Sequence, residues 1–129
     1  MEINYITDET KKAREFFQEK ISFMITPCEL KQKIKDFIND INIVDVREYD
    51  RYIDGHIPFA IHVPFNDLEN HMVMLEKDKL NIIYNCSAYC HKAYKTAYYL
   101  ASKGYMVRVL EGGFKIWEEK NYEIVKTSA

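Results

Sequence analysis

The sequence lacks the features that mark membrane and secreted proteins. It has no apolar run of about 18 residues, the length that a transmembrane helix requires. Its first residues, MEINYITDETKK, do not form a basic stretch followed by an apolar one, so we expect no signal peptide. It has only three cysteines, an odd number, and we do not expect them to form a disulfide framework. A cytoplasmic location is therefore predicted.

An excess of charge of one sign is also missing. The chain has 18 Lys and Arg against 20 Asp and Glu, mixed along its length, for a net charge of −2. Because a nucleic-acid or membrane-surface binder needs a basic stripe, we expect neither kind of partner. Four glycines and three prolines leave no linker or low-complexity tract. What remains is a chain of 129 residues, 47% of them apolar, which is enough for one globular domain with a core.

Hydrophobic periodicity predicts two helices at the start of the chain. Residues 9–24 place apolar side chains on one helical face, namely Ala13, Phe16, Phe17, Ile21 and Met24. We expect this helix to belong to an N-terminal extension, residues 1–25, packed on a domain of residues 26–129. The domain begins with a second helix, for which Thr26 is the predicted N-cap and Glu29 completes a capping box.

Helices and strands alternate along the rest of the chain. Short β-branched runs predict strands at residues 41–46, 60–63, 80–85 and 106–110. Helical patterns predict helices at residues 48–53, 66–76, 91–103 and 114–120. The alternation indicates an α/β fold with a central, mostly parallel sheet and helices on both faces. Since the reactive site of such a sheet lies just beyond the carboxyl end of a strand, residues 86–92 are the candidate site.

Cys86 is the candidate nucleophile in that segment, because it follows a predicted strand and precedes a predicted helix. Backbone N–H groups of such a loop and the start of the helix favour an anion, and Lys92 and a protonated His91 act in the same direction. These effects favour thiolate over thiol, the form that nucleophilic sulfur chemistry needs. The alternative interpretation is a small, buried apolar side chain. Cys90 is a second candidate, either as the nucleophile or as a thiol that resolves an intermediate on Cys86.

Metal and phosphate chemistry are disfavoured at this loop. The pattern Cys86-x-x-x-Cys90-His91 supplies fewer ligands than a closed zinc site requires, and the sequence has no second cluster, so we expect no metal. A phosphatase loop would carry an arginine late in the loop to bind phosphate with two hydrogen bonds. Lys92 stands there instead.

Four segments, in this order, resemble the signatures of the rhodanese family: residues 43–52 (IVDVREYDRY), 55–60 (GHIPFA), 82–86 (IIYNC) and 110–117 (LEGGFKIW). The similarity covers roughly residues 27–121. The helix before it resembles a feature of one subgroup of single-domain members, which also has a second cysteine in the loop. The resemblance implies a three-layer, rhodanese-like domain that acts as a sulfurtransferase without a metal or organic cofactor.

The resemblance also implies roles for individual residues. Cys86 would attack the sulfane sulfur of a small donor, hold it as a persulfide and pass it to a thiol or a protein acceptor. N–H groups of the loop would stabilise the anionic persulfide, and the loop consists of Ser87, Ala88, Tyr89, Cys90, His91 and Lys92. We expect the Cys86 sulfur at the floor of a shallow pocket that these groups surround. Structural support is expected from Asp45, Arg47, His56, Gly112 and Gly113. Either a monomer or a homodimer is compatible with this function.

The sequence departs from the family pattern in three places. Phe59 replaces a usual glycine, and the loop lacks an arginine that is common in members that use thiosulfate, so thiosulfate is a disfavoured donor. Counting back from Gly104 places Asn85 at the family's cysteine position, whereas counting forward along the preceding strand places Cys86 there. Two further functions therefore stay open. One is a catalytically inactive binding or regulatory module with this fold, and the other is a thiol redox protein that uses Cys86 and Cys90.

Overall fold

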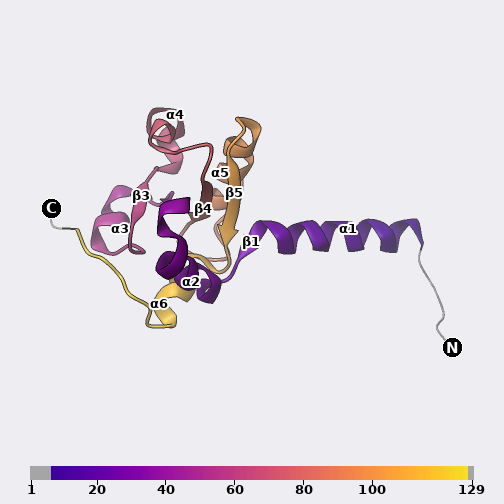
Figure 1. The fold of residues 1–129 in the computed structure, drawn as a ribbon, viewed down its shortest axis with the longest axis horizontal. Coiled ribbons are helices and arrows are strands. Elements are labelled where there is room, and N and C mark those ends of the chain that lie inside the picture. Colours follow the sequence, from indigo (N-terminus) through magenta and orange to yellow (C-terminus); the bar gives the residue numbers. More distant parts are fainter. Residues whose placement is uncertain (1–6, 128–129) are drawn as a thin grey trace.

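The structure of the protein is a computed structural model that describes residues 7–127 (Figure 1). Its elements follow in the order α1 (Asp8–Phe23), β1 (Met24–Ile25), α2 (Pro27–Phe37), η1 (Ile38–Asp40), β2 (Ile41–Asp45), α3 (Tyr49–Asp54), β3 (Ala60–His62), η2 (Phe65–Asp67), α4 (Leu68–His71), η3 (Met72–Met74), β4 (Leu80–Tyr84), α5 (Lys92–Ser102), β5 (Met106–Leu110) and α6 (Gly113–Glu119), in which η denotes a 3-10 helix. The predicted helix at residues 66–76 is instead two 3-10 turns around one short helix.

The five strands form one sheet in the order β1-β5-β4-β2-β3, and all of its strand pairs are parallel. The predicted α/β class is therefore confirmed. The edge strand β1 was not predicted. Its two residues, Met24 and Ile25, pair with Val109 and Leu110, so the helical pattern assigned to residues 9–24 ends one residue too late.

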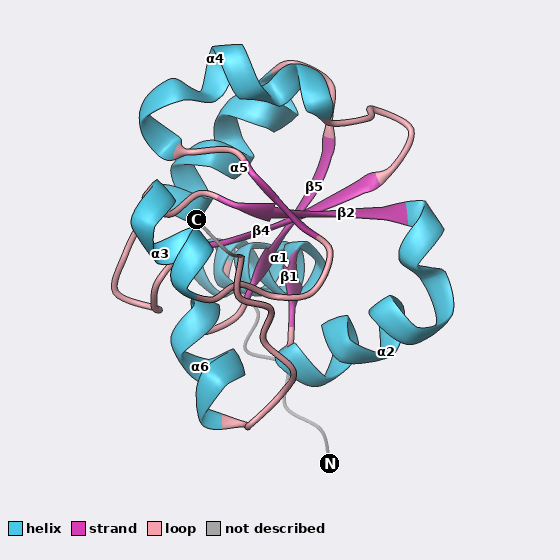
Figure 2. Ribbon diagram, turned by 90° about the vertical axis from the view of Figure 1, so that its left-hand side faces the viewer, coloured by secondary structure: helices cyan, strands magenta, loops and turns pink. Residues whose placement is uncertain are grey.

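Successive side chains of the central strands point to opposite faces and build two cores. Ile43 and Ile82 join the core on the side of α2 and α6, whereas Val44 and Ile83 join the core on the side of α5. Figure 2 shows the sheet between α2 and α6 on one side and α4 and α5 on the other. The predicted three-layer arrangement is confirmed.

The predicted capping box at the start of α2 is present. Thr26 Oγ1 accepts a hydrogen bond from the backbone N–H of Glu29 at 3.2 Å, and Glu29 Oε1 accepts one from the N–H of Thr26 at 3.4 Å. These bonds satisfy N–H groups that the first turn of a helix otherwise leaves free. They fix the turn between β1 and α2.

Helix α1 projects away from the domain, as Figure 1 shows. The extension was expected to pack on the domain, but none of the residues of α1 is buried. Phe16, Phe17 and Ile21 of its predicted inward face are more than half exposed. The helix approaches the domain beside β5 and α5, through its C-terminal half. Residues 1–6 of the extension lie outside the described residues. None of the helices within residues 7–127 is both long and apolar enough to cross a membrane.

Candidate active site

The end of β2 carries a buried ion pair. Asp45 is the last residue of the strand, and Arg47 Nη2 lies 2.7 Å from Asp45 Oδ2. Arg47 Nε donates to both carboxylate oxygens at 3.1 Å, and its backbone N–H donates to Oδ1 at 2.9 Å. The same guanidinium donates to the carbonyl oxygen of Gly55 at 2.6 Å and lies 4.1 Å from the centre of the Phe114 ring. Arg47 is therefore held from several sides.

Tyr84 closes the network from the neighbouring strand. It is the last residue of β4, and the parallel register places it beside Asp45. Its hydroxyl donates to Asp45 Oδ2 at 2.5 Å and accepts from the N–H of Ile57 at 3.2 Å. Burial, followed by the charge of Asp45, raises the pKa of Tyr84 well above its ordinary value. The hydroxyl therefore remains a donor to the carboxylate.

The charge of Arg47 reaches the cysteine loop. Burial opposes the charged form, but hydrogen bonds to Asp45 and the charge of that carboxylate outweigh this effect and raise the pKa of Arg47. Smaller contributions in the same direction come from Tyr84 and from Cys86. The Phe114 ring lies 4.1 Å from the guanidinium, and the N–H of Phe114 bonds to Asn85, the residue before Cys86, so the charge of Arg47 lies near the base of the loop.

The loop from residue 85 to residue 91 is anchored at its first two residues. Asn85 is buried, its side-chain amide donates to the carbonyl oxygen of Cys90, and its own carbonyl oxygen accepts from the N–H of Phe114 at 2.8 Å. The carbonyl oxygen of Cys86 accepts from the N–H of Lys115 at 2.9 Å. The backbone on both sides of the Asn85–Cys86 peptide bond is thus fixed to the start of α6.

Two glycines allow the start of α6 to approach the loop closely at Asn85. Gly112 and Gly113 have φ angles of +80° and +66°, a region that other residues rarely adopt. A Cβ on Gly113 would lie 2.8 Å from both oxygens of Asn85 and 2.9 Å from the backbone nitrogen of Ser87. The position therefore has no room for a side chain while the loop keeps its place.

The outer part of the loop is more open. The N–H of Cys90 donates to the carbonyl oxygen of Ser87 at 3.2 Å, and the N–H of Tyr89 donates to Ser87 Oγ at 3.3 Å. Two of the N–H groups expected around the sulfur of Cys86 are thus bonded within the loop, because residues 87–90 form a tight turn. Cys86 and Cys90 are half-buried, and Tyr89 is 89% exposed.

The loop lies between two hollows. One, of about 430 Å³, is lined by Ala88 of the loop together with Glu111 and residues of α1, α2 and α5. The other, of about 170 Å³, is lined by Lys92 and Arg47 together with residues that follow β2 and β3. Lys92 Nζ lies 5.9 Å from the centre of the Phe65 ring. His91 is exposed, and its ring meets Tyr94 edge-on at 6.3 Å.

Two histidines lie on either side of Tyr52, away from the cysteine loop. His56 Nδ1 hydrogen-bonds the carbonyl oxygen of Tyr52 at 2.9 Å, and the two rings stack at 4.1 Å. His62 Nε2 hydrogen-bonds the carbonyl oxygen of Arg47 at 2.7 Å and stacks on Tyr52 at 4.8 Å. The His56 side chain thus binds the backbone of Tyr52. His62 binds the backbone of Arg47.

Sequence reasoning missed the roles of Tyr84 and Asn85. A polar side chain at the end of a buried strand needs a bonding partner, which is Asp45 of the adjacent strand for Tyr84 and the carbonyl oxygen of Cys90 for Asn85. The adjacency of those two strands was the piece of information that the sequence did not provide.

Comparison with known proteins identifies the family. The profile described as "Rhodanese-like domain" matches residues 26–120, which is most of the chain. The chain belongs to the rhodanese-like domain family. The family resemblance of the sequence motifs is thereby confirmed.

Sequence relatives of this rhodanese-like domain include sulfurtransferases. The putative sulfurtransferase YtwF of Bacillus subtilis is 31% identical over 94 residues, which cover 73% of this chain and 88% of that protein. The thiosulfate sulfurtransferase GlpE of Coxiella burnetii is 31% identical over 83 residues, covering 61% of this chain and 73% of the relative. Distant homology to sulfurtransferases thus points to a rhodanese-type enzyme.

Among solved structures, the BH2092 protein of Bacillus halodurans superposes with a TM-score of 0.83 at 33% identity, covering 92% of this chain and 87% of its own. A coverage of 92% exceeds what residues 26–129 alone can supply, so the match includes part of α1. The N-terminal helix therefore has a structural counterpart in another rhodanese-like chain.

Proposed function

We propose that this rhodanese-like domain is a sulfurtransferase that carries sulfane sulfur as a persulfide on Cys86. The observation that carries the proposal is the position of Cys86: it follows β4 at the carboxyl edge of a parallel sheet, is half-buried, and comes directly after the strand ends that Asp45, Arg47 and Tyr84 bond together. The distant sulfurtransferase homologues support the same reaction.

The reaction proceeds in two displacements. In the first, the Cys86 thiolate attacks the sulfane sulfur of a donor persulfide, R–S–S⁻. The S–S bond of the donor breaks, a new bond joins the sulfane sulfur to Cys86, and the donor leaves as the thiolate R–S⁻. In the second, the thiolate of an acceptor, a small thiol or a protein cysteine, attacks the outer sulfur and takes it, which regenerates the Cys86 thiolate. Neither step requires an oxidant.

The cations around the loop favour a donor of low charge. Arg47 is bonded to Asp45 and Gly55, so its guanidinium is not free to hold a second anion with two hydrogen bonds. Lys92 and His91 are single-point donors in the same region. A persulfide or polysulfide with one negative charge on its sulfur therefore fits this loop better than doubly charged thiosulfate.

Mass spectrometry of the intact protein tests the proposal. After incubation with a small-molecule persulfide, a polysulfide or thiosulfate, we expect the wild-type chain to gain the mass of one sulfur atom, and peptide mapping to place it on Cys86. Cys86→Ser should abolish the gain, while Cys90→Ser and the exposed Cys28→Ser serve as matched controls that keep it. Added thiol should then remove the sulfur from the wild type.

Other outcomes distinguish the remaining functions. Sulfur found on Cys90 in the wild type would move the nucleophile to that residue. A reversible loss of two hydrogens that requires both Cys86 and Cys90 would favour thiol redox chemistry instead. If no donor loads any cysteine, the sulfurtransferase proposal is wrong.

The position of Asn85 favours a non-catalytic module as the second candidate function. Its buried amide occupies the first loop position after β4 and bonds to the carbonyl oxygen of Cys90. If Asn85 stands where an active chain has its cysteine, Asn85→Cys should accept sulfur while the wild type does not. Loading of the wild type on Cys86 would rule this function out.

A further inference from the structure

Helix α1 presents an aromatic surface that nothing in the described part of the chain covers. Phe16, Phe17, Ile21 and Phe23 are 57%, 57%, 76% and 59% exposed, and no residue of the helix is buried. An isolated helix of 16 residues is marginally stable in water, and most helices in proteins depend on burying one face. A contiguous apolar patch of this kind marks an interaction site on a soluble protein.

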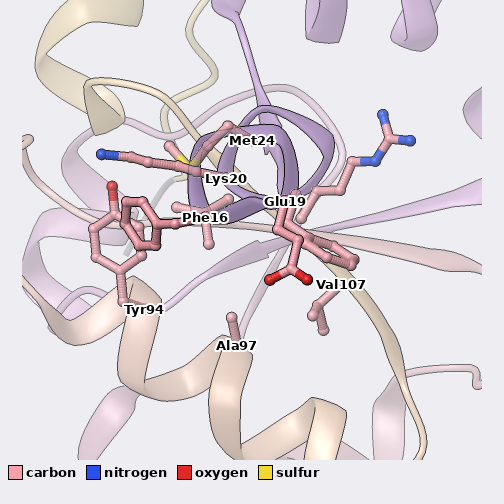
Figure 3. A pocket seen from close by; sticks show the side chains of 10 residues that line it. Phe16, Glu19, Lys20, Met24, Tyr94, Ala97 and Val107 are labelled. Atoms are coloured by element: carbon pink, nitrogen blue, oxygen red, sulfur yellow. The ribbon is translucent and has the colours of Figure 1, made fainter. Parts of the chain in front are cut away.

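A groove lies directly beside this surface. A cavity of about 450 Å³ separates α1 from α5 and β5, with Phe16 and Met24 on one wall and Tyr94, Ala97 and Val107 on the other. Figure 3 shows α1 nearly end-on above α5, with Phe16 and Glu19 on the side of α1 that is nearer to Tyr94 and Ala97. The groove is mainly apolar, although Glu19, Lys20 and Arg108 also line it, and an amphipathic helix can pack into a site of this kind.

We infer that a second copy of this chain covers the surface, with the two α1 helices antiparallel about a two-fold axis near the middle of each helix. The helix and the groove lie next to each other on one chain. A two-fold axis therefore places each α1 against the groove of the other copy and leaves neither surface open. A single symmetric contact then covers both the exposed face of α1 and the groove beside it.

The charges of α1 suit a copy of itself. The helix has four acidic and four basic residues and so no net charge. Its first turn carries Asp8 and Glu9, and its last turn carries Lys20. In an antiparallel pair the first turn of one helix lies toward the last turn of the other, so these opposite charges approach each other across the axis.

The available area is sufficient for a reversible dimer. Six large apolar side chains of α1 and α5 are at least 42% exposed: Phe16, Phe17, Ile21, Phe23, Tyr94 and Tyr98. Since an aromatic side chain buries 150–250 Å² when fully covered, about 100 Å² for each gives roughly 600 Å² per copy. The pair then buries about 1,200 Å², the lower end of the range for specific interfaces.

The dimer also affects access to the cysteine loop. Lys20, Ile21 and Tyr94 line the hollow that Ala88 of the loop shares. A second copy seated on α1 borders this hollow from outside. The inference does not depend on the proposed sulfur transfer, because the oligomeric state can be measured whether or not any cysteine accepts sulfur.

Sedimentation equilibrium of the full chain, over a range of protein concentrations, tests the inference. We expect a concentration-dependent dimer for the wild type, and a monomer at all concentrations for Phe17→Glu and for Ile21→Glu. Val73→Glu is the matched control, because it places the same charge on a residue that is 78% exposed in η3, outside the patch, and should leave the dimer intact. Circular dichroism should show that all variants are folded, with a lower helical signal only for Phe17→Glu and Ile21→Glu, whose α1 is left uncovered.

A cross-linking experiment locates the contact independently. With Cys28, Cys86 and Cys90 replaced by serine, Phe17→Cys should form a disulfide-linked dimer on oxidation and Val73→Cys should not. A wild type that stays monomeric at all concentrations, or a dimer that Phe17→Glu and Ile21→Glu leave unchanged, would overturn the inference. So would a monomeric wild type that sediments with phosphatidylcholine–phosphatidylglycerol vesicles, since α1 would then bind a lipid surface instead.

Discussion

The ends of the neighbouring strands β2 and β4 lie side by side, yet they are built in opposite ways. At the end of β2, Asp45 and Arg47 are buried and bonded to each other, to Tyr84 and to the backbone of Gly55. Beyond β4, the chain is fixed at Asn85 and then opens into a turn whose outer residues face solvent. One strand end is closed and rigid, and the other is accessible.

This difference assigns separate tasks to the two regions. Arg47 is held by Asp45, by Gly55 and by the ring of Phe114, so its guanidinium is bonded to groups of the domain itself. The loop after β4 has few internal bonds, and its two cysteines are half-buried. An open loop thus lies beside a closed network of bonded side chains.

The largest expected effect comes from breaking the closed end of β2. Arg47→Ala leaves the Asp45 carboxylate buried without its cation, and such a loss costs about 3–5 kcal/mol. Urea unfolding should show this decrease in the free energy of unfolding. Arg51→Ala is the matched control, because Arg51 is exposed on α3 and its loss should change stability by less than about 0.5 kcal/mol. Equal effects of the two changes would mean that the ion pair does not hold the strand end.

The next largest effect is expected where the open loop rests on α6. Gly113→Ala places a methyl group against Asn85 and Ser87 at a positive φ, which should cost about 2–4 kcal/mol and displace the loop. Gly104→Ala is the matched control: its φ is also positive, but its new Cβ would meet only Lys77 Nζ, at 4.0 Å. It should cost only the backbone strain, about 1 kcal/mol.

Sulfur loading separates the two glycine variants further. If the contact between the cysteine loop and α6 positions Cys86, Gly113→Ala should accept sulfur more slowly than the wild type under native conditions. Gly104→Ala should accept it at the wild-type rate. Unchanged loading in Gly113→Ala would show that the loop keeps its reactivity without this contact.

Much of the fold could be predicted because its determinants are local. The β-branched runs of β2 and β4 and the capping box of Thr26 and Glu29 each act within a few residues, so the sequence contains the whole signal. Strand β1 could not be predicted in this way. Its two residues form a strand only because β5, far along the chain, offers them an edge to pair with.

The candidate site was predictable in place but not in detail. The rule for parallel sheets located the segment that begins at Cys86, and the family motifs located Asp45 and Arg47. The hydrogen bond between Tyr84 and Asp45 depends on β2 and β4 being adjacent, and the contact of Asn85 with Gly113 depends on the close approach of α6. Contacts between segments far apart in the sequence leave no local pattern.

A smaller effect, with a pH dependence, is expected for Tyr84→Phe. The change removes the donor to Asp45 and the acceptor of the Ile57 N–H, at a cost of about 1–3 kcal/mol near neutral pH. The pKa of Tyr84 is raised in the folded state, whereas an unfolded tyrosine ionises near pH 10. As the pH rises above about 10, the unfolded state releases a proton that the folded state keeps, so this contribution to stability falls.

Urea unfolding of the wild type and Tyr84→Phe at several pH values measures this contribution. The difference between the two free energies of unfolding should be constant below about pH 9 and should shrink as the pH rises beyond about 10. Tyr98→Phe, at an exposed tyrosine, should track the wild type throughout. A difference for Tyr84→Phe that grows with pH would contradict the buried, neutral hydroxyl.

The smallest effect is expected within the open part of the loop. Ser87→Ala removes the hydroxyl that accepts from the N–H of Tyr89 at 3.3 Å, but that N–H is exposed and can bond to water instead. The free energy of unfolding should therefore change by less than about 0.5 kcal/mol. Since the backbone bond from Cys90 to the carbonyl oxygen of Ser87 remains, the turn should keep its shape and Cys86 should still load with sulfur. Urea unfolding measures this change. A decrease of about 2 kcal/mol or more in the free energy of unfolding, similar to that expected for Gly113→Ala, would show that the loop is packed as tightly as the end of β2.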